Sequence, residues 1–370
     1  MSLFNECASL FVVGFPGLSP DAEVLRLIDD GVGGVILFKR NVDSPAQVAS
    51  LVRTLKTHAG RPLLASVDQE GGRVARLRGA PFTALPPMRQ LGLAGDAALV
   101  ERAGRLLAHE VRALGFDVDF APVLDVDTNP ANPVIGDRSF HRDPAEVARL
   151  GVALARGLEA GGVASCAKHF PGHGDTAKDS HLDLPSLPHG LERLRQVELL
   201  PFAAYAKAGL ASVMTAHVIF DALDPGVPAT MSTRVMEGLL RKELAFTGVV
   251  VSDDLEMKAI ADHFSVERAV VEGVKAGVDC FLVCHHATVQ RAAIEALVKA
   301  VESGEVKRER LQEARARMDA LARRFVHGPE DLLSTLGTPA HEALRTGLSG
   351  ESFTGRDPTE VHLPAGRGPA

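Results

Sequence analysis

Short apolar runs alternate along the chain with longer segments whose apolar residues recur roughly every three to four positions. Continuous apolar runs are typical of strands buried on both faces. Apolar residues at every third or fourth position are typical of helices with one buried face. The predicted strands are residues 10–14, 34–38, 63–67, 118–124, 163–167, 211–216, 248–251 and 280–284. The predicted helices are residues 44–58, 96–114, 143–158, 201–208, 232–243, 265–276 and 288–303, and Ser-Pro or Asp-Pro opens the first and third.

This alternation predicts one α/β domain with parallel strands. A doubly wound open sheet is the alternative, but Phe15-Pro-Gly17 after the first strand lacks a glycine-rich dinucleotide fingerprint. The count of eight strands favours a (β/α)₈ TIM barrel over residues 1–326. Residues 327–370 form a linker and tail too short for a second domain, and their Gly, Pro, Ser and Thr content predicts poor order beyond about residue 348.

The formal net charge is −7 and no basic stripe is present, which argues against nucleic-acid binding. The first residues lack a secretory signal pattern, and no apolar run reaches the roughly 20 residues of a membrane span. The four cysteines lack zinc-type spacing and are expected to be free thiols. We therefore expect a cytoplasmic, monomeric protein with no membrane partner.

Several predicted strands end on polar residues, namely Asp68, Lys168-His169, His217 and Asp253. In parallel barrels the active site lies at these carboxyl ends. Asp253 is followed by Asp254, so Asp254 can cap the next helix, over residues 255–263, while Asp253 points into the barrel mouth as a nucleophile.

The loop after Lys168 and His169 carries many titratable groups among glycines. Asp179 and His181 are one residue apart, so in an extended segment both side chains point the same way. A carboxylate that fixes one imidazole nitrogen makes the other more basic, and His181 is therefore a candidate general acid and base. We expect Lys168 and His169 to be a rigid clamp, and residues 172–184 to be a mobile flap that holds His181 away from Asp253 without ligand.

Three further residues, Asp68, Arg76 and Arg138, offer a carboxylate beside guanidinium groups, which suits sugar recognition. For either arginine alone, a surface salt bridge is the alternative. A zinc site of His169, His173, Asp175 and His181 is disfavoured, because the spacing matches no zinc pattern and Lys168 adds a cation. We expect neither a metal nor a cofactor.

These motifs resemble the bacterial β-N-acetylhexosaminidases of glycoside hydrolase family 3. The resemblance rests on Lys168-His-Phe-Pro-Gly-His-Gly-Asp-Thr176, Asp179-Ser-His181, Val67-Asp-Gln-Glu-Gly-Gly-Arg73, Phe120-Ala-Pro-Val-Leu-Asp125, Ile135-Gly-Asp-Arg-Ser-Phe140 and Ser252-Asp-Asp-Leu255. It implies a TIM barrel that removes terminal β-linked N-acetylglucosamine, typically in peptidoglycan recycling.

The resemblance also implies roles for single residues. Asp253 would be the nucleophile and His181 the acid and base, assisted by Asp179. The sugar-binding positions would be Asp68, Arg76, Arg138, Lys168 and His169. Because the chain has no Trp, we expect small muropeptide-like substrates rather than long polysaccharides.

Three alternatives remain open. A histidine acid/base could admit phosphate, so the chain could be a glycoside phosphorylase. It could also be a β-glucosidase or β-xylosidase on the same scaffold. A non-catalytic sugar-binding protein is the third alternative, but it would not need Asp253 together with Asp179 and His181.

Overall fold

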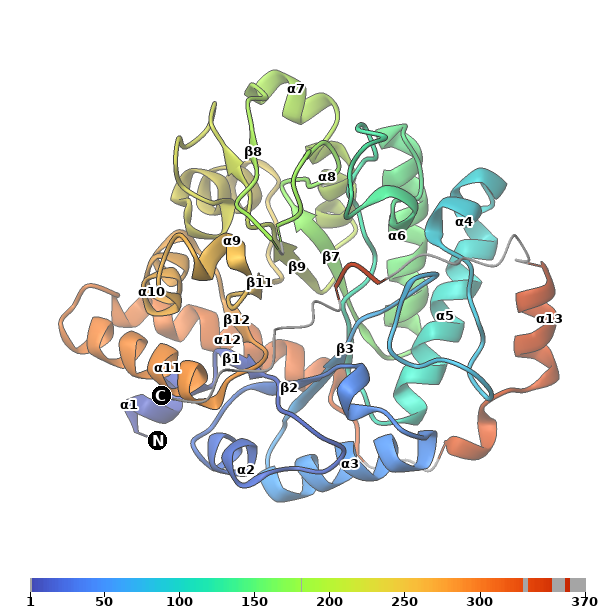
Figure 1. The fold of residues 1–370 in the computed structure, drawn as a ribbon, viewed down its shortest axis with the longest axis horizontal. Coiled ribbons are helices and arrows are strands. Elements are labelled where there is room, and N and C mark those ends of the chain that lie inside the picture. Colours follow the sequence, from blue (N-terminus) through green and yellow to red (C-terminus); the bar gives the residue numbers. More distant parts are fainter. Residues whose placement is uncertain (1, 181, 329–331, 348–356, 360–370) are drawn as a thin grey trace.

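The computed structural model describes residues 2–180, 182–328, 332–347 and 357–359. Eight parallel strands from these residues close into a barrel that helices surround (Figure 1). Around the barrel the order is β1 (Phe11–Val13), β2 (Gly34–Leu37), β3 (Leu64–Val67), β6 (Val118–Asp119), β7 (Ala164–Phe170), β9 (Ser212–Thr215), β11 (Val249–Asp254) and β12 (Cys280–Val283). β12 pairs with β1, where Phe281 lies opposite Phe11, and closes the ring. The prediction of a (β/α)₈ barrel is confirmed.

The predicted helices form the outer layer of the barrel. They are α3 (Pro45–Ala59), α5 (Ala97–Ala113), α6 (Pro144–Ala160), α8 (Leu199–Lys207), the π-helical segment Arg234–Glu243, α10 (Val266–Ala276) and α11 (Ala287–Glu302). Both predicted N-caps are present. The Ser44 side chain accepts from the Gln47 N–H, and the Asp143 carboxylate accepts from the Ala145 N–H.

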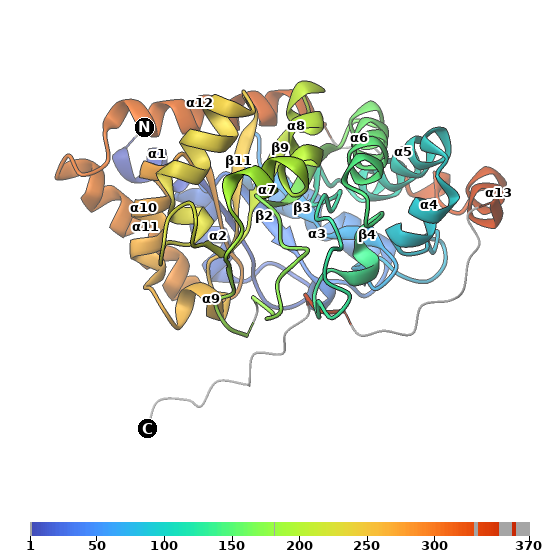
Figure 2. The ribbon, with the colours of Figure 1, turned by 90° about the horizontal axis from the view of Figure 1, so that it is seen from above.

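Several helices have no counterpart in the sequence prediction. They are α1 (Leu3–Ala8), α2 (Ala22–Asp29), α4 (Met88–Ala94), α7 (Leu191–Gln196), α12 (Arg308–Phe325) and α13 (Pro339–Gly347). The helix expected over residues 255–263 is present but shorter, as α9 (Lys258–Ala261). α12 is rich in charge, yet Leu311, Ala314, Met318, Leu321 and Phe325 form one buried stripe at helical spacing. In Figure 2, α1 and α12 lie on the side of the barrel opposite α9.

One predicted strand is shorter than expected. β6 ends at Asp119 rather than at Leu124, because Pro122 has no N–H to donate to a neighbouring strand. Pairing resumes beyond the proline, where Val123 bridges to Lys168 of β7. Beyond this bridge the Leu124 N–H donates to the Lys168 carbonyl oxygen, so the segment after the proline stays attached to β7.

Two short pairs of strands lie in the loops beyond the barrel. β4 (Gln69–Gly71) and β5 (Val74–Ala75) form an antiparallel pair directly after β3. β8 (Ser186–Leu187) and β10 (Ile219–Phe220) form a parallel pair that links the loops after β7 and β9. Both pairs therefore give regular structure to the loops of the barrel's carboxyl end.

The predicted tail is only partly within the described residues. After α12 the chain forms a short 3₁₀ turn at Leu333–Thr335 and then α13. Residues 348–356 and 360–370, where poor order was expected, lie outside the described part of the chain. Residues 357–359 form the short red segment over the centre of the barrel in Figure 1. None of the described helices combines the length and apolar character needed to cross a membrane.

The tightest packing between outer helices is at the crossing of α5 and α6, where two glycines meet. A Cβ atom added to Gly157 would lie 2.2 Å from the Glu101 carbonyl oxygen and 2.9 Å from the Gly104 Cα atom. These are backbone atoms, so a side chain at this position can be accommodated only if the helices separate. The crossing therefore requires glycine.

We expect Gly157→Ala to destabilise the fold by about 1–3 kcal/mol, because overpacking a backbone contact outweighs the better helix propensity of alanine. Denaturant unfolding measures the difference. Gly190→Ala is the matched control, since a Cβ atom there meets nothing within 4 Å, and its effect should stay within about 0.5 kcal/mol. Equal stability of the two variants would contradict this account of the crossing.

Candidate active site

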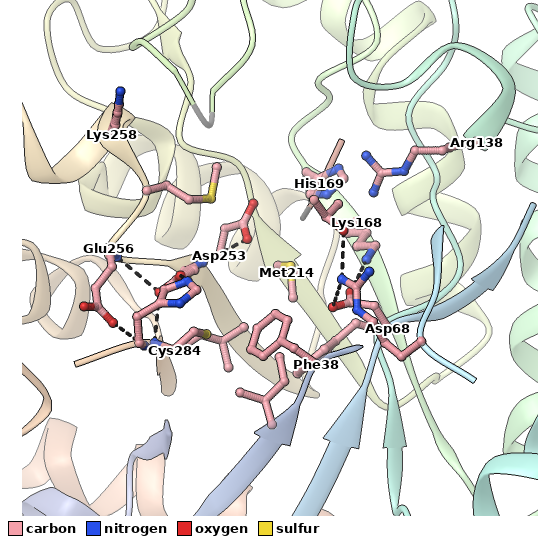
Figure 3. Close-up of a pocket in the computed structure, with 18 residues that line it drawn as sticks. Phe38, Asp68, Arg138, Lys168, His169, Met214, Asp253, Glu256, Lys258 and Cys284 are labelled. Atoms are coloured by element: carbon pink, nitrogen blue, oxygen red, sulfur yellow. Dashed lines mark hydrogen bonds and ion pairs between the residues drawn. The ribbon is translucent and has the colours of Figure 1, made fainter. Parts of the chain in front are cut away.

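A pocket opens where the carboxyl ends of the barrel strands meet. Figure 3 shows Asp253 on one side and Asp68, Lys168 and Arg138 on the other, with Met214 between them. The pocket is lined by Ile36, Phe38, Asp68, Arg76, Phe120, Arg138, Lys168, His169, Met214, Asp253, Asp254, Glu256, Met257, Lys258, Leu282, Cys284, His285 and Thr359. Six of the eight residues predicted from the sequence thus lie around one cavity.

A buried ammonium group organises one side of the pocket. Lys168 lies near the carboxyl end of β7, and its Nζ atom lies 2.8 Å from Asp68 Oδ1 and 2.7 Å from Glu70 Oε1. Both carboxylates follow β3, so the lysine bonds the ends of two separate strands. The Lys168 side chain is 2% exposed, and a buried ammonium requires such partners.

Two arginines extend this network. Arg138 donates from Nε and Nη2 to the two oxygens of Glu70, at 2.9 and 2.8 Å. Arg76 donates from Nη2 to Asp68 Oδ2 at 3.0 Å. Neither arginine forms the surface salt bridge that was the alternative, because the side chains are 2% and 0% exposed. Bidentate pairing of this kind fixes geometry as well as charge.

The network keeps its charges at neutral pH. Burial alone would raise the pKa of Glu70 and of Asp68, but the neighbouring cations outweigh burial and hold both pKa values below their ordinary range. Asp119 lies close by and has no such cation bonded to it, and burial raises its pKa well above the ordinary value. Asp68 and Glu70 are therefore held as ionised carboxylates, whereas burial favours the neutral form of Asp119.

His169 is held by a second buried carboxylate. Its Nδ1 atom lies 2.7 Å from Asp125 Oδ2, and Asp125 also accepts from the backbone N–H groups of His169 and His173. Burial raises the pKa of Asp125, but hydrogen bonds and charge from the two histidines outweigh burial, so the pKa lies below its ordinary value. Because Nδ1 is bonded to the carboxylate, Nε2 is the ring nitrogen of His169 that remains for a ligand in the pocket.

Asp253 and Asp254 end β11. One oxygen of the Asp253 carboxylate accepts from the Asp254 backbone N–H at 2.8 Å. Asp254 does not cap a long helix, so that prediction is wrong. Its carboxylate accepts instead from the N–H groups of Glu256 and Cys284, and the short helix α9 begins only after Met257. These bonds tie the end of β11 to that of β12.

His217, at the end of β9, lies beneath this strand end. Its ring is fixed by Thr230 at Nδ1 and by the Asp254 carbonyl oxygen at Nε2. Burial lowers the pKa of His217 more than the nearby Asp253 and Asp254 raise it. The ring is therefore neutral near neutral pH and holds the backbone that carries Asp253.

The loop that carries the predicted acid/base is a turn rather than an extended segment. The Asp179 carbonyl oxygen accepts from the N–H groups of Leu182 and Asp183, so the expectation of extended backbone is wrong. His181 lies outside the described residues. Ser180, the residue before it, is buried and bonded to His173 Nε2, and its carbonyl oxygen accepts from the Ala259 N–H. Ser180 thereby links the loop to His173 on one side and to α9 on the other.

The zinc alternative finds no support in the described part of the chain, which holds no group of three or more side chains suited to a metal ion. His173 has both ring nitrogens bonded, Nδ1 to Thr176 and Nε2 to Ser180. Asp175 pairs with His189 instead of facing His173. These residues stabilise the loop.

Sequence reasoning missed several residues of the site. Glu70 and Asp125 both follow predicted strands, so the rule that identified Asp68 could have found them. Phe38 and His285 have the same strand-end position and line the pocket. Thr359 gives no signal in the sequence, because it comes from a tail with no regular pattern.

Residues 6–321 match the model of the glycosyl hydrolase family 3 N-terminal domain. The "Beta-hexosaminidase A" of Pseudoalteromonas piscicida is 38% identical, over 95% of this chain and 62% of the relative. The chain thus spans less than two thirds of that relative. A "Beta-hexosaminidase" of Thiobacillus denitrificans is 45% identical over 72% of this chain and 75% of the relative.

Solved structures agree with these relatives. A glycoside hydrolase family 3 β-N-acetylglucosaminidase from Paenibacillus sp. str. FPU-7 has a TM-score of 0.91 and 45% identity, and the match covers 94% of this chain and 68% of that one. NagZ from Neisseria gonorrhoeae in complex with N-trifluoroacetyl-D-glucosamine has a TM-score of 0.74 and 34% identity, covering 91% of this chain and 96% of that one.

We expect Glu70→Gln to destabilise the protein by about 3–5 kcal/mol at pH 7, because it removes a buried charge bonded to Arg138 and Lys168. The pKa of Glu70 is lowered in the folded protein, so its contribution is present above the ordinary glutamate pKa of about 4.3 and is lost as pH falls below it. The gap between wild type and variant, measured by denaturant unfolding, should therefore narrow below about pH 4.

The exposed pair Glu146 and Arg149 offers the control. Glu146→Gln should change stability by no more than about 0.5 kcal/mol. A difference in unfolding free energy between wild type and Glu70→Gln that stays constant down to pH 3 would contradict the role given to the buried Glu70 charge.

Proposed function

The chain belongs to glycosyl hydrolase family 3, and from that premise we propose that it removes terminal, non-reducing β-linked N-acetylglucosamine from small glycans such as muropeptides. The family match, the curated β-hexosaminidases and the solved β-N-acetylglucosaminidases support this substrate class. A place in peptidoglycan turnover follows from the same proposal.

The observation that carries the proposal is the position of Asp253 across the pocket from the charge network. A carboxylate stands on one side of the cavity, and hydrogen-bonding groups that suit sugar hydroxyls stand on the other (Figure 3). This separation lets one side hold the ring while the other reacts at its anomeric carbon.

The proposed first step is attack by Asp253. A carboxylate oxygen forms a bond to the anomeric carbon while the bond to the leaving oxygen breaks, and His181 protonates that oxygen. The bond from the Asp254 N–H to Asp253 Oδ1 orients the carboxylate for this attack. The product is a glycosyl-aspartate ester and a free aglycone.

The proposed second step is hydrolysis of the ester. His181, now neutral, takes a proton from water, and the water oxygen attacks the anomeric carbon and releases Asp253. Two displacements at the same carbon retain its configuration. Asp179 would hold the His181 ring, and Ser180 anchors the loop between His173 and α9.

The remaining predicted residues would hold the sugar. Asp68 and Glu70 take two of the three N–H donors of Lys168, and the third is available to a hydroxyl group. His169 Nε2 is the ring nitrogen left for a sugar hydroxyl, because Nδ1 is engaged by Asp125. Arg138 keeps Glu70 in place, and Arg76 does the same for Asp68.

We expect Asp253→Asn to lower kcat for an aryl N-acetyl-β-glucosaminide by about a thousandfold or more, because the nucleophile is lost. Intact mass after trapping with a 5-fluoro sugar should show an adduct on the wild type, within the peptide that contains Asp253, and none on the variant. Assays with and without phosphate separate hydrolysis from phosphorolysis.

Asp262→Asn, an exposed carboxylate at the end of α9, is the matched control and should retain full activity. Near-full hydrolysis by Asp253→Asn, or an adduct on another peptide, would overturn the assignment.

We expect His181→Ala to slow the ester hydrolysis most, and to slow the first step far less for activated aryl leaving groups than for poor ones. The reason is that a good leaving group needs no proton. A series of aryl N-acetylglucosaminides with pre-steady-state kinetics measures both steps. His58→Ala, on α3, serves as the control, and equal loss for good and poor leaving groups would argue against the acid role.

A further inference from the structure

The segment Asp357–Thr359 reaches the barrel mouth from the far end of the chain. Asp357 Oδ2 accepts from Arg76 Nη1 at 2.6 Å, and Thr359 Oγ1 accepts from Arg76 Nη2 at 2.7 Å. The Arg76 side chain is 0% exposed, so the segment completes its burial. Figure 1 places these residues over the centre of the barrel, near the ends of β3 and β7.

The segment is itself ordered by hydrogen bonds. Asp357 Oδ1 accepts from both the N–H and the hydroxyl of Thr359, at 2.9 and 2.7 Å. One Asp357 carboxylate thus holds Arg76 with one oxygen and Thr359 with the other. The three side chains form a closed set in which each one fixes the next.

The charges of the network make an acidic partner favourable at this place. Lys168 bonds both Asp68 and Glu70, and Arg138 bonds Glu70, so Arg76 shares its network carboxylate, Asp68, with the lysine. Asp357 gives Arg76 a second carboxylate, bonded directly to its Nη1 atom. An unmatched buried cation would be costly.

The segment borders the pocket without filling it. Thr359 is half-buried and is one of the lining residues, and the cavity still reaches Asp68, Lys168 and Asp253 with the segment in place. The Thr359 hydroxyl donates to Asp357 and accepts from Arg76, which leaves one lone pair for a further donor. A sugar hydroxyl bound beside Asp68 is such a donor.

We propose that Asp357–Thr359 forms one wall of the sugar pocket. Thr359 is an additional substrate-binding residue, and Asp357 is a positioning residue that holds Arg76 and Thr359 in place. The identity of the sugar in this inference rests on the proposed function. Arg76 is assigned to orienting Asp68 and Thr359, because Asp68 bonds the arginine on one side and Asp357 and Thr359 bond it on the other.

The test compares Thr359→Val, Thr359→Ser, Asp357→Ala and the double variant in the full-length chain. We expect Thr359→Val and Asp357→Ala each to raise KM for an aryl N-acetyl-β-glucosaminide about tenfold, with kcat within about threefold of wild type. Thr359→Ser keeps the hydroxyl and should stay within about twofold. The double variant should be no worse than Asp357→Ala, because both residues act at one place.

Matched controls are Thr57→Val on α3 and Asp319→Ala on α12, both exposed and far from the pocket in sequence and fold. An unchanged melting temperature in all variants excludes a folding defect. Unchanged KM in both Thr359→Val and Asp357→Ala would overturn the inference. Lower KM would also overturn it, since it would mean that the segment competes with the sugar.

The proposed function is tested separately, by whether the wild-type protein alone cleaves an aryl N-acetyl-β-glucosaminide. If wild type cleaves another aryl glycoside instead, the proposed function fails. The ratios of variant KM to wild-type KM, measured on that glycoside, then test whether Asp357–Thr359 forms a wall of the pocket. Affinity for free N-acetylglucosamine by calorimetry gives a second reading. A wild type that binds this sugar about tenfold more tightly than Thr359→Val supports the wall even without turnover, and equal affinities overturn it.

Discussion

A single buried ammonium group sets the arrangement of the barrel mouth. Lys168 can remain buried and charged only where carboxylates meet it, and Asp68 and Glu70 approach it from another strand. The same two carboxylates then position Arg76 and Arg138. Because each charge depends on its neighbours, the end of β3, the end of β7 and the loop after β6 have one mutually consistent arrangement. The side of the pocket proposed to bind sugar is thereby organised before any substrate arrives.

The other side of the pocket has a different construction. Asp253 is oriented by a backbone N–H, and the backbone around it is held by His217 and by bonds to β12. Asp68 and Glu70, in contrast, are each bonded to two buried cations. One side of the pocket is therefore fixed by ion pairs, and backbone hydrogen bonds fix the strand end on the other.

The sequence predicted what depends on local pattern. Neighbouring residues alone identify the apolar strand runs, the helix caps at Ser44 and Asp143, and the polar residues at strand ends. These features predicted the barrel and most of the pocket. The predictions failed where a contact joins residues that are distant in sequence. Nothing near Glu70 indicates that it will meet Arg138, and α12 has a charged composition that hid its buried stripe. The turn at Asp179 escaped notice because alternation of polar residues is compatible with more than one backbone path.

The pairing of Arg76 with Asp357 joins residues 281 positions apart. Ribosomal synthesis proceeds from the N-terminus, and domains begin to fold as they emerge. The barrel can close only when β12 is available to pair with β1, and Arg76 meets its last partners later still. A nascent chain with a closed barrel would thus carry a pocket that still lacks its Asp357–Thr359 wall. If that wall binds sugar as proposed, binding competence is acquired only once these residues have emerged and met Arg76.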